Sequence, residues 1–174
     1  MKEDVKFNLD GEEVIAKVGE TIWDVAFRKG KELPHLCHSG EIGYRPDGNC
    51  RACMVEIEGE RTLAASCIRN PTENMVVKST NPRSVKARKM VMELLLADQP
   101  EKEVAHDQSS HLFNTAGLQD ITHSRFPRIE SEVVVPTDDS HSAMRVNLDA
   151  CIHCGLCARA CREVQVNDVI GMAG

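Results

Sequence analysis

The chain has 174 residues, of which 41% are apolar and 28% are charged, as in an ordinary globular protein of one domain or two small ones. A net charge of −6 and an aromatic content of 3% argue against nucleic-acid binding, which uses basic surfaces and aromatic platforms. The N-terminus lacks an apolar signal-peptide core, and no apolar stretch approaches the ~20 residues that span a bilayer. We therefore expect a cytoplasmic protein with no nucleic-acid partner and no transmembrane segment.

The N-terminal segment, residues 1–30, predicts a hairpin followed by a helix. Residues 5–18 alternate between apolar and polar side chains and are interrupted by Asp10-Gly11, a strong hairpin signal. Residues 21–30 have the pattern of a helix, with a capping box formed by Thr21 and Asp24 and a glycine at the C-terminal stop.

Two further segments complete a sheet within residues 1–80. Residues 54–66 predict a second hairpin that turns near Glu58-Gly59, and residues 75–78 predict a last short strand. The resulting order (two strands, a helix, a loop, two strands, a strand) is that of a β-grasp ferredoxin, with the cysteine loop at one edge of the sheet.

The eight cysteines form two groups of four, and the long stretch between the groups contains no cysteine. The first group has the spacing C-x12-C-x2-C-x13-C and resembles plant-type [2Fe–2S] sites, although its first gap is longer. Glycines between the first two cysteines suit a loop that folds around a buried anionic cluster. The predicted ligands of a [2Fe–2S] cluster are Cys37, Cys50, Cys53 and Cys67.

The middle of the chain begins with a helix that opens at Asn81-Pro82, because proline suits the first helical position. Its expected apolar face comprises Val85, Val91, Leu94 and Leu95. Five basic residues in and before this helix favour a solvated face over a docking surface for an acidic partner: Lys78, Arg83, Lys86, Arg88 and Lys89. Residues 98–124 are polar, and their histidines His106, His111 and His123 are expected to be surface or hydrogen-bonded residues.

The last third of the chain leads into the second cysteine group. Residues 125–144 predict a loop-rich linker, residues 145–148 a short strand, and residues 163–170 a helical or extended tail.

The second cysteine group has the spacing C-x2-C-x2-C-x3-C of a bacterial-ferredoxin [4Fe–4S] site. Its predicted ligands are Cys151, Cys154, Cys157 and Cys161, and Arg162 stands where this run usually has proline. In two-cluster ferredoxins the fourth cysteine ligates the other cluster. Cys161 therefore either closes its own cluster or pairs with polypeptide outside this chain.

Other interpretations of the cysteines stay open at this point. Either group could hold a structural zinc ion, which would make the chain an interaction module, or could consist of inert or disulfide-bonded thiols. A third interpretation is a redox- or iron-sensing regulator with labile clusters, against which the acidic charge balance counts.

The sequence resembles the N-terminal part of the alpha subunit of NAD-dependent molybdenum or tungsten formate dehydrogenases. That part is similar to the large iron–sulfur subunit of respiratory complex I and to the diaphorase subunit of NAD-reducing hydrogenases. The resemblance covers nearly the whole chain and is carried by ETIWDVA, PHLCHSG, RPDGNCRACMVEIEGERTLAASC, KMVMELLLADQP, SRFPRIE and MRVNLDACIHCGLCARACREVQVNDVIGMAG. It implies two partners, a flavin/NAD diaphorase-type subunit and a molybdopterin catalytic region or subunit.

Two departures from the family limit this resemblance. The family often binds a further [4Fe–4S] cluster through one histidine and three cysteines, but Gln99 and Glu103 stand where the histidine and the first cysteine would be. We predict that this site is absent. A second four-cysteine run and the molybdopterin-binding region are also missing, so the chain is interpreted as a fragment or a shortened homologue.

Together these features predict an α+β protein with three parts. Residues 1–80 are a β-grasp [2Fe–2S] ferredoxin-type domain, residues 81–124 a helical linker, and residues 125–174 a small bacterial-ferredoxin-like [4Fe–4S] segment. The chain shows no dinucleotide fingerprint, phosphate loop or nucleophile–base pair, so no catalytic site is expected within it. We predict an electron relay between a formate-oxidising centre and a diaphorase, or else in a complex I-like or hydrogenase-like oxidoreductase. His38 and Arg51 flank cluster ligands and are expected to raise the first cluster's potential.

Overall fold

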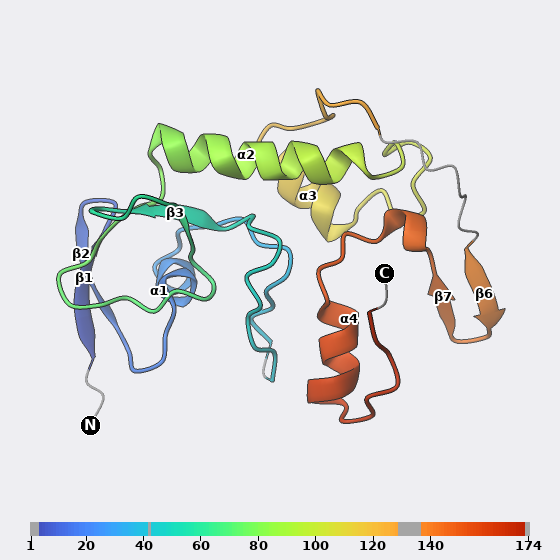
Figure 1. The fold of residues 1–174 in the computed structure, drawn as a ribbon, viewed down its shortest axis with the longest axis horizontal. Coiled ribbons are helices and arrows are strands. Elements are labelled where there is room, and N and C mark those ends of the chain that lie inside the picture. Colours follow the sequence, from blue (N-terminus) through green and yellow to red (C-terminus); the bar gives the residue numbers. More distant parts are fainter. Residues whose placement is uncertain (1–3, 42, 129–136, 173–174) are drawn as a thin grey trace. The chain divides into compact units, whose positions relative to one another are not determined.

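The computed structural model describes residues 4–41, 43–128 and 137–172 (Figure 1). The chain divides into two units. Unit 1 comprises Met1–Arg88 together with Gly155–Gly174, and unit 2 comprises Lys89–Cys154.

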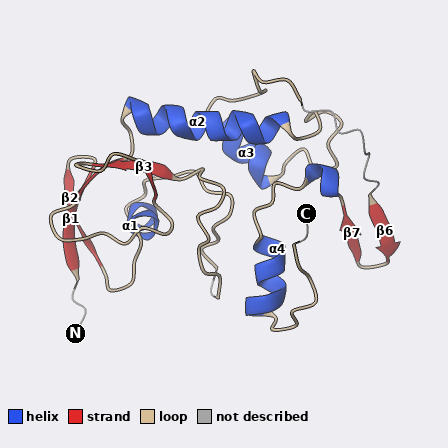
Figure 2. Cartoon of the chain, viewed as in Figure 1, coloured by secondary structure: helices blue, strands red, loops and turns tan. Residues whose placement is uncertain are grey.

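Unit 1 is built on a five-stranded mixed sheet with the strand order β2-β1-β5-β3-β4. Figure 2 labels β1, β2 and β3 of this sheet. The late strand β5 lies at the centre, where it pairs parallel with β1 and antiparallel with β3. This topology and the helix packed on the sheet confirm the predicted α+β class and the β-grasp order of residues 1–80. The strands are β1 (Val5–Leu9), β2 (Glu12–Ala16), β3 (Met54–Ile57), β4 (Ala64–Ala65) and β5 (Val76–Lys78).

The hairpin of β1 and β2 turns at Asp10-Gly11, as predicted. Both residues have positive φ angles, 53° and 88°, and such a turn matches the twist of the flanking strands. The Asp10 carboxylate also accepts hydrogen bonds from the Ser79 backbone N–H and hydroxyl, each at 2.6 Å. These bonds attach the hairpin turn to the end of β5.

Helix α1 (Ile22–Arg28) has the predicted capping box, in which Thr21 and Asp24 satisfy each other's backbone N–H groups. Two further N–H groups of its first turn are satisfied by distant carbonyls: Ile22 donates to Arg69 and Trp23 donates to Ser66, at 2.9 and 3.1 Å. The apolar face of α1 and the inner face of the sheet form one buried core, which includes Phe7, Leu9, Val14, Ile22, Val25, Ala26, Val55 and Val77.

Helix α2 (Pro82–Ala97) begins at Pro82, as predicted, but its buried face differs from the expected one. Leu94 is 51% exposed, whereas Ser84, Arg88 and Met92 are buried at a spacing of four residues. The Arg88 guanidinium donates to the carbonyls of Met54 and Ser79 at 2.9 and 2.8 Å. Arg88 is therefore not part of the predicted solvated basic face, because its side chain binds backbone carbonyls of the sheet region.

Unit 2 contains a short helix, α3 (His111–Gly117), whose N-cap is Ser110. The buried apolar residues of unit 2 include Met92, Ala97, Leu112, Ala116 and Ile121. A two-stranded hairpin pairs β6 (Asp138–His141) with β7 (Met144–Val146).

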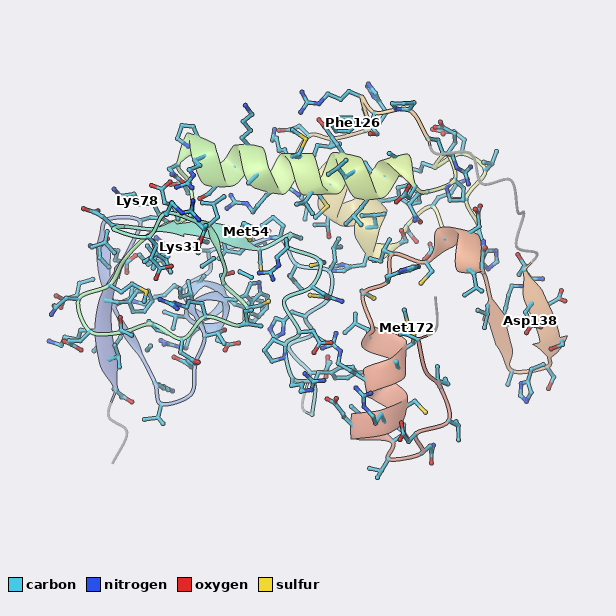
Figure 3. All side chains as sticks on the ribbon, in the orientation of Figure 1. Lys31, Met54, Lys78, Phe126, Asp138 and Met172 are labelled. Carbon is cyan, nitrogen blue, oxygen red and sulfur yellow. The ribbon has the colours of Figure 1, made fainter. Side chains whose placement is uncertain are left out.

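The hairpin corrects two predictions for the last third of the chain. Residues 125–144 were expected to be a linker, but β6 lies within them, and Figure 3 labels its first residue, Asp138. All four residues of β6 are exposed, so they give no alternating pattern. Part of that linker, residues 129–136, lies outside the described residues. The strand predicted over 145–148 ends at Val146, and Leu148–Ala150 form a 3-10 turn capped by the Asn147 side chain.

The C-terminal part of unit 1, Gly155–Gly174, contains a helix that begins before the predicted residues 163–170. Helix α4 (Leu156–Arg159) continues as one π-helical turn over Ala160–Val164. The positive φ angles of Val166 and Asp168, 57° and 48°, exclude a regular helix or strand over 163–170. Among the described residues no helix has the length and apolar character required to cross a membrane.

Candidate iron–sulfur centres

The sheet and α1 position the segments that carry the first four cysteines. Cys37 follows α1, Cys53 immediately precedes β3, and Cys67 lies just after β4; all three are buried. Pairing of β3 with β4 brings Cys53 and Cys67 together, and Ser66 reinforces this by donating from its N–H and its hydroxyl to the Cys53 carbonyl, at 3.2 and 2.8 Å. Met54, the first residue of β3, marks in Figure 3 where the loop enters the sheet.

The four thiols contact one another in pairs. The Cys37 thiol is within hydrogen-bonding reach of the Cys50 and Cys67 thiols, and the Cys53 thiol is within reach of Cys67. No group of three or more His, Cys, Asp or Glu side chains within the described ranges forms a site for a single metal ion. A [2Fe–2S] cluster distributes four thiolates over two irons, and pairwise contacts among four thiols fit such a distribution.

Hydrogen bonds to these four sulfurs shift the pKa values of their thiols. Donation from the Cys50 and Cys67 thiols lowers the pKa of Cys37, and donation from the Cys67 thiol lowers the pKa of Cys53. The same hydrogen bonds raise the pKa of the two donors, Cys50 and Cys67. Backbone N–H groups of Cys50 and Asn49 also donate to the Cys37 sulfur, and the Ala52 N–H lies 3.5 Å from the Cys50 sulfur. Because the thiolate is the metal ligand, this donor set fits a bound anionic cluster.

The loop between Cys37 and Cys53 needs glycine at position 48. Gly48 has a φ of 66°, and a β-carbon there would lie 2.7 Å from Cδ1 of Ile68, the residue after Cys67. A side chain at this position would therefore be strained and would displace the Ile68 side chain. Arg51, between two candidate ligands, also has a positive φ (59°) and an exposed side chain.

His38 differs from Arg51 in its environment. Its ring is buried, packs edge-on against Trp23 with centroids 4.5 Å apart, and lies 3.9 Å from a carboxylate oxygen of Asp24. Neither ring nitrogen has a hydrogen-bond partner among the residues that the structure describes. Burial lowers the pKa of His38 and favours the neutral ring. The predicted increase in the first cluster's potential by positive charge therefore depends on Arg51.

The second cysteine group begins in unit 2 and ends in unit 1. In unit 2, Cys151 follows the 3-10 turn, and the His153 N–H lies 3.4 Å from its sulfur. In unit 1, Cys157 is exposed on α4, whereas Cys161 is buried in the π-helical turn. The chain folds back after this turn, so that the Val169 N–H lies 3.3 Å from the Cys161 sulfur. Backbone N–H groups directed at the sulfurs of Cys151 and Cys161 fit a cluster held by thiolates.

All eight cysteines lie in the described residues, and none of them forms a disulfide there. The three histidines considered earlier, His106, His111 and His123, are exposed. Gln99 is buried and Glu103 is exposed at the two positions where the family's further cluster ligands would stand.

Arg159 was not identified from the sequence. It lies on α4 between Cys157 and Cys161, is only 2% exposed, and donates hydrogen bonds to the carbonyls of Cys37 and Arg45. An arginine in a cysteine-rich helical turn has the same sequence signature whether it is solvated or buried. Only the folded arrangement, which brings together residues far apart in the chain, reveals its contacts.

Comparison with protein families identifies both cluster-binding parts. Residues 2–82 match the 2Fe-2S iron-sulfur cluster binding domain, and residues 144–163 match the 4Fe-4S binding domain. The zinc and inert-thiol interpretations of the cysteine groups are therefore not supported.

Similar proteins are much longer than this chain. "Putative formate dehydrogenase YrhE" of Bacillus subtilis (strain 168) is 30% identical over 172 residues, covering 97% of this chain and 17% of that protein. The mitochondrial NADH-ubiquinone oxidoreductase 78 kDa subunit of Neurospora crassa is 28% identical over 177 residues, covering 98% of this chain and 23% of that protein. The chain thus spans less than a third of the length of these relatives.

A solved structure extends the similarity to three dimensions. A chain of the NAD+-reducing [NiFe]-hydrogenase in the H2-reduced state matches with a TM-score of 0.82 and 28% identity, covering 98% of this chain and 71% of that chain. The protein is therefore an iron–sulfur protein with a 2Fe-2S domain and a 4Fe-4S segment, homologous to formate dehydrogenase-type, NADH-ubiquinone oxidoreductase-type and hydrogenase-type chains.

Proposed function

We propose that this chain is a cytoplasmic electron-transfer module whose eight cysteines hold two clusters. Cys37, Cys50, Cys53 and Cys67 are the proposed ligands of the [2Fe–2S] cluster, and Cys151, Cys154, Cys157 and Cys161 those of the [4Fe–4S] cluster. The proposed division keeps residues 1–80 as the first cluster domain, 81–124 as linker and 125–174 as the second cluster segment. When bound, each cluster accepts and releases one electron at a time.

The main support is the convergence of the first four thiols under backbone N–H donors. Four thiolates complete the coordination of such a cluster, which leaves no position for substrate. The protein's role is then to bury the cluster, hold its sulfurs in hydrogen bonds and set its potential. In this proposal the chain passes electrons and the chemistry of the substrate takes place on a partner.

The proposed partners are a flavin/NAD diaphorase-type subunit and a formate-oxidising molybdopterin region or subunit. The resemblance of NLDACIHC and CREVQVNDVIG to formate dehydrogenases and the 30% identity to YrhE support this choice. An electron-transfer role in a hydrogenase-like or complex I-like oxidoreductase is the second candidate. The TM-score of 0.82 to the hydrogenase chain favours it.

Iron and sulfide analysis of the anaerobically prepared chain, with EPR after dithionite reduction, tests the cluster assignment. We expect about six irons per chain and two distinct reduced signals, the sum of one [2Fe–2S] and one [4Fe–4S] cluster. About two irons and a single signal would mean that the second cluster needs polypeptide from elsewhere. Zinc without iron would refute the proposal.

Metal analysis of the complex isolated from its native host separates the two candidate functions. Molybdenum or tungsten together with formate-dependent reduction of the clusters supports the first candidate. Nickel with hydrogen-dependent reduction supports the hydrogenase-like alternative.

A further inference from the structure

We propose that Arg159 is a positioning residue that joins the loop carrying Cys37 to the helix carrying Cys157 and Cys161, and thereby sets the electronic contact between the two clusters. This inference rests on the proposed function. All the contacts that carry it lie within unit 1.

The first observation is the burial of a charged group. Arg159 is among the largest fully buried side chains of the chain, and a guanidinium is almost never buried unless its charge is paired. Its Nε lies 3.1 Å from the Asp47 carboxylate, and its two Nη atoms donate to the carbonyls of Arg45 and Cys37. Arg159 therefore binds three groups of the loop over residues 37–47.

The second observation is where these contacts fall in relation to the proposed ligands. Arg159 lies midway between Cys157 and Cys161, and one of its acceptors is the carbonyl of Cys37 itself. One hydrogen bond thus joins the backbone of a [2Fe–2S] ligand to the helical turn that carries two [4Fe–4S] ligands. Groups that bind ligand residues in this way fix the orientation of a metal site.

A second connection between the same two segments is weaker. Arg45 pairs with Glu163 at 3.0 Å, but the Arg45 side chain is 59% exposed. Exposed ion pairs contribute little, because water and salt screen them. The planar fork of Arg159 reaches two carbonyls and a carboxylate together, which a lysine ammonium cannot reproduce with the same geometry.

The test uses the full chain with both clusters loaded and reduced by dithionite. The measurement is the magnetic spin–spin interaction between the two reduced clusters, observed by EPR as splitting or enhanced relaxation. We expect this interaction in the unmodified chain and its loss or marked weakening in Arg159→Gln, with the iron content unchanged at about six per chain. The matched control is Arg162→Gln, since Arg162 follows on the same helical segment and has a side chain that is 49% exposed.

A second variant distinguishes the geometry of the Arg159 hydrogen bonds from the positive charge of its side chain. Arg159→Lys keeps the positive charge and loses the fork, so we expect both clusters to form and the spin interaction to weaken. If Arg159→Gln does not retain both clusters, Arg159→Lys and Asp47→Asn provide the same measurement in milder form.

Two results would overturn the inference while leaving the proposed function intact. One is an unchanged spin interaction in Arg159 variants that retain both clusters; the other is no interaction in an unmodified chain that holds both clusters. A chain without iron would instead refute the proposed function, and the inference with it.

Discussion

At the scale of single residues, hydrogen bonds to sulfur give the first cysteine group its chemical character. Cys37 accepts N–H groups from Asn49 and Cys50, and Cys50 accepts the N–H of Ala52. Each such bond stabilises negative charge on sulfur. The same bonds stabilise the reduced, more negative state of a cluster and thus raise its potential.

Arg51 adds a full positive charge to these dipoles, and its removal is expected to lower the midpoint potential of the [2Fe–2S] cluster. An exposed charge a few ångströms from another contributes on the order of 1 kcal/mol in water, and ~59 mV corresponds to a tenfold change for one electron. We expect Arg51→Ala to lower the potential by tens of millivolts in an EPR-monitored redox titration.

Arg61→Ala is the control for this titration, because Arg61 is exposed in the turn between β3 and β4 and is not adjacent to a cysteine. An Arg51→Ala potential equal to that of the unmodified chain would refute the role of Arg51.

At the scale of elements, α1 supports the cysteine loop through its N-terminus. Its first N–H groups bind the carbonyls of Ser66 and Arg69, which flank Cys67. The Trp23 indole N–H donates to the Leu33 carbonyl at 3.1 Å, on the segment that leads to Cys37. The helix thus holds the approaches to two of the four candidate ligands.

Loss of the capping box should loosen this support. Thr21→Ala removes the hydroxyl that accepts from the Asp24 N–H at 3.2 Å, and such a loss costs ~1 kcal/mol. We expect amide hydrogens of α1 to exchange roughly fivefold faster, since ~1 kcal/mol corresponds to about that factor. Thr21→Ser keeps the hydroxyl and should exchange like the unmodified chain; equal rates in Thr21→Ala would contradict the role of the cap.

Arg88 illustrates how much an element depends on contacts beyond its own sequence. Burial lowers the pKa of its guanidinium, so its charge is maintained at a cost in desolvation. Its side chain binds the carbonyl of Met54, the residue that follows Cys53, and the carbonyl of Ser79. Arg88 therefore attaches α2 to the strand that directly follows Cys53.

Replacing Arg88 should destabilise unit 1 even though it removes a buried charge. Arg88→Met leaves two carbonyls without their donor, which costs about 1–3 kcal/mol, and we expect this cost to outweigh the relief of desolvation. We expect the thermal midpoint to fall by a few degrees in circular dichroism. Lys86→Met, at an exposed position of the same helix, should leave it unchanged. Equal midpoints in both variants would mean that relief of the Arg88 desolvation offsets the lost hydrogen bonds.

The sequence predicts those elements whose signal is local. Asp10-Gly11 and the Thr21–Asp24 box determine a turn and a helix start through neighbours in the chain, and both predictions are confirmed. The burial of Arg88 and Arg159 depends on acceptors far along the chain. Strand β6 has four exposed residues and no periodicity, so it carries no local signal.

For the candidate sites, too, the local sequence predicts one part and the folded chain determines the other. The cysteine spacing predicts the two cluster types, which the matched families confirm. It does not predict which N–H groups approach each sulfur, because the Asn49 amide and the Val169 amide reach their sulfurs only through loop conformation. The positive φ angles of Val166 and Asp168, which turn the chain back towards Cys161, are conformations that non-glycine residues seldom adopt.

At the scale of the whole molecule, the two proposed clusters differ in how far their ligands lie apart along the chain. The ligands of the first span residues 37–67 and depend on α1, β3 and β4 for their position. Those of the second lie within one short run, residues 151–161, and their spacing is local. The local spacing predicts that the second cluster forms independently of the first, although Cys157 and Cys161 belong to the same compact unit as the first cysteine group.

Substitution of one ligand from each group tests this independence. We expect Cys53→Ala to abolish the [2Fe–2S] EPR signal and to leave the [4Fe–4S] signal, with iron falling from about six to about four per chain. Cys157→Ala is the converse variant and should retain the [2Fe–2S] signal alone. Loss of both signals in Cys53→Ala would mean that the Cys157–Cys161 segment depends on an ordered Cys37–Cys53 loop, since Arg159 binds the carbonyl of Cys37.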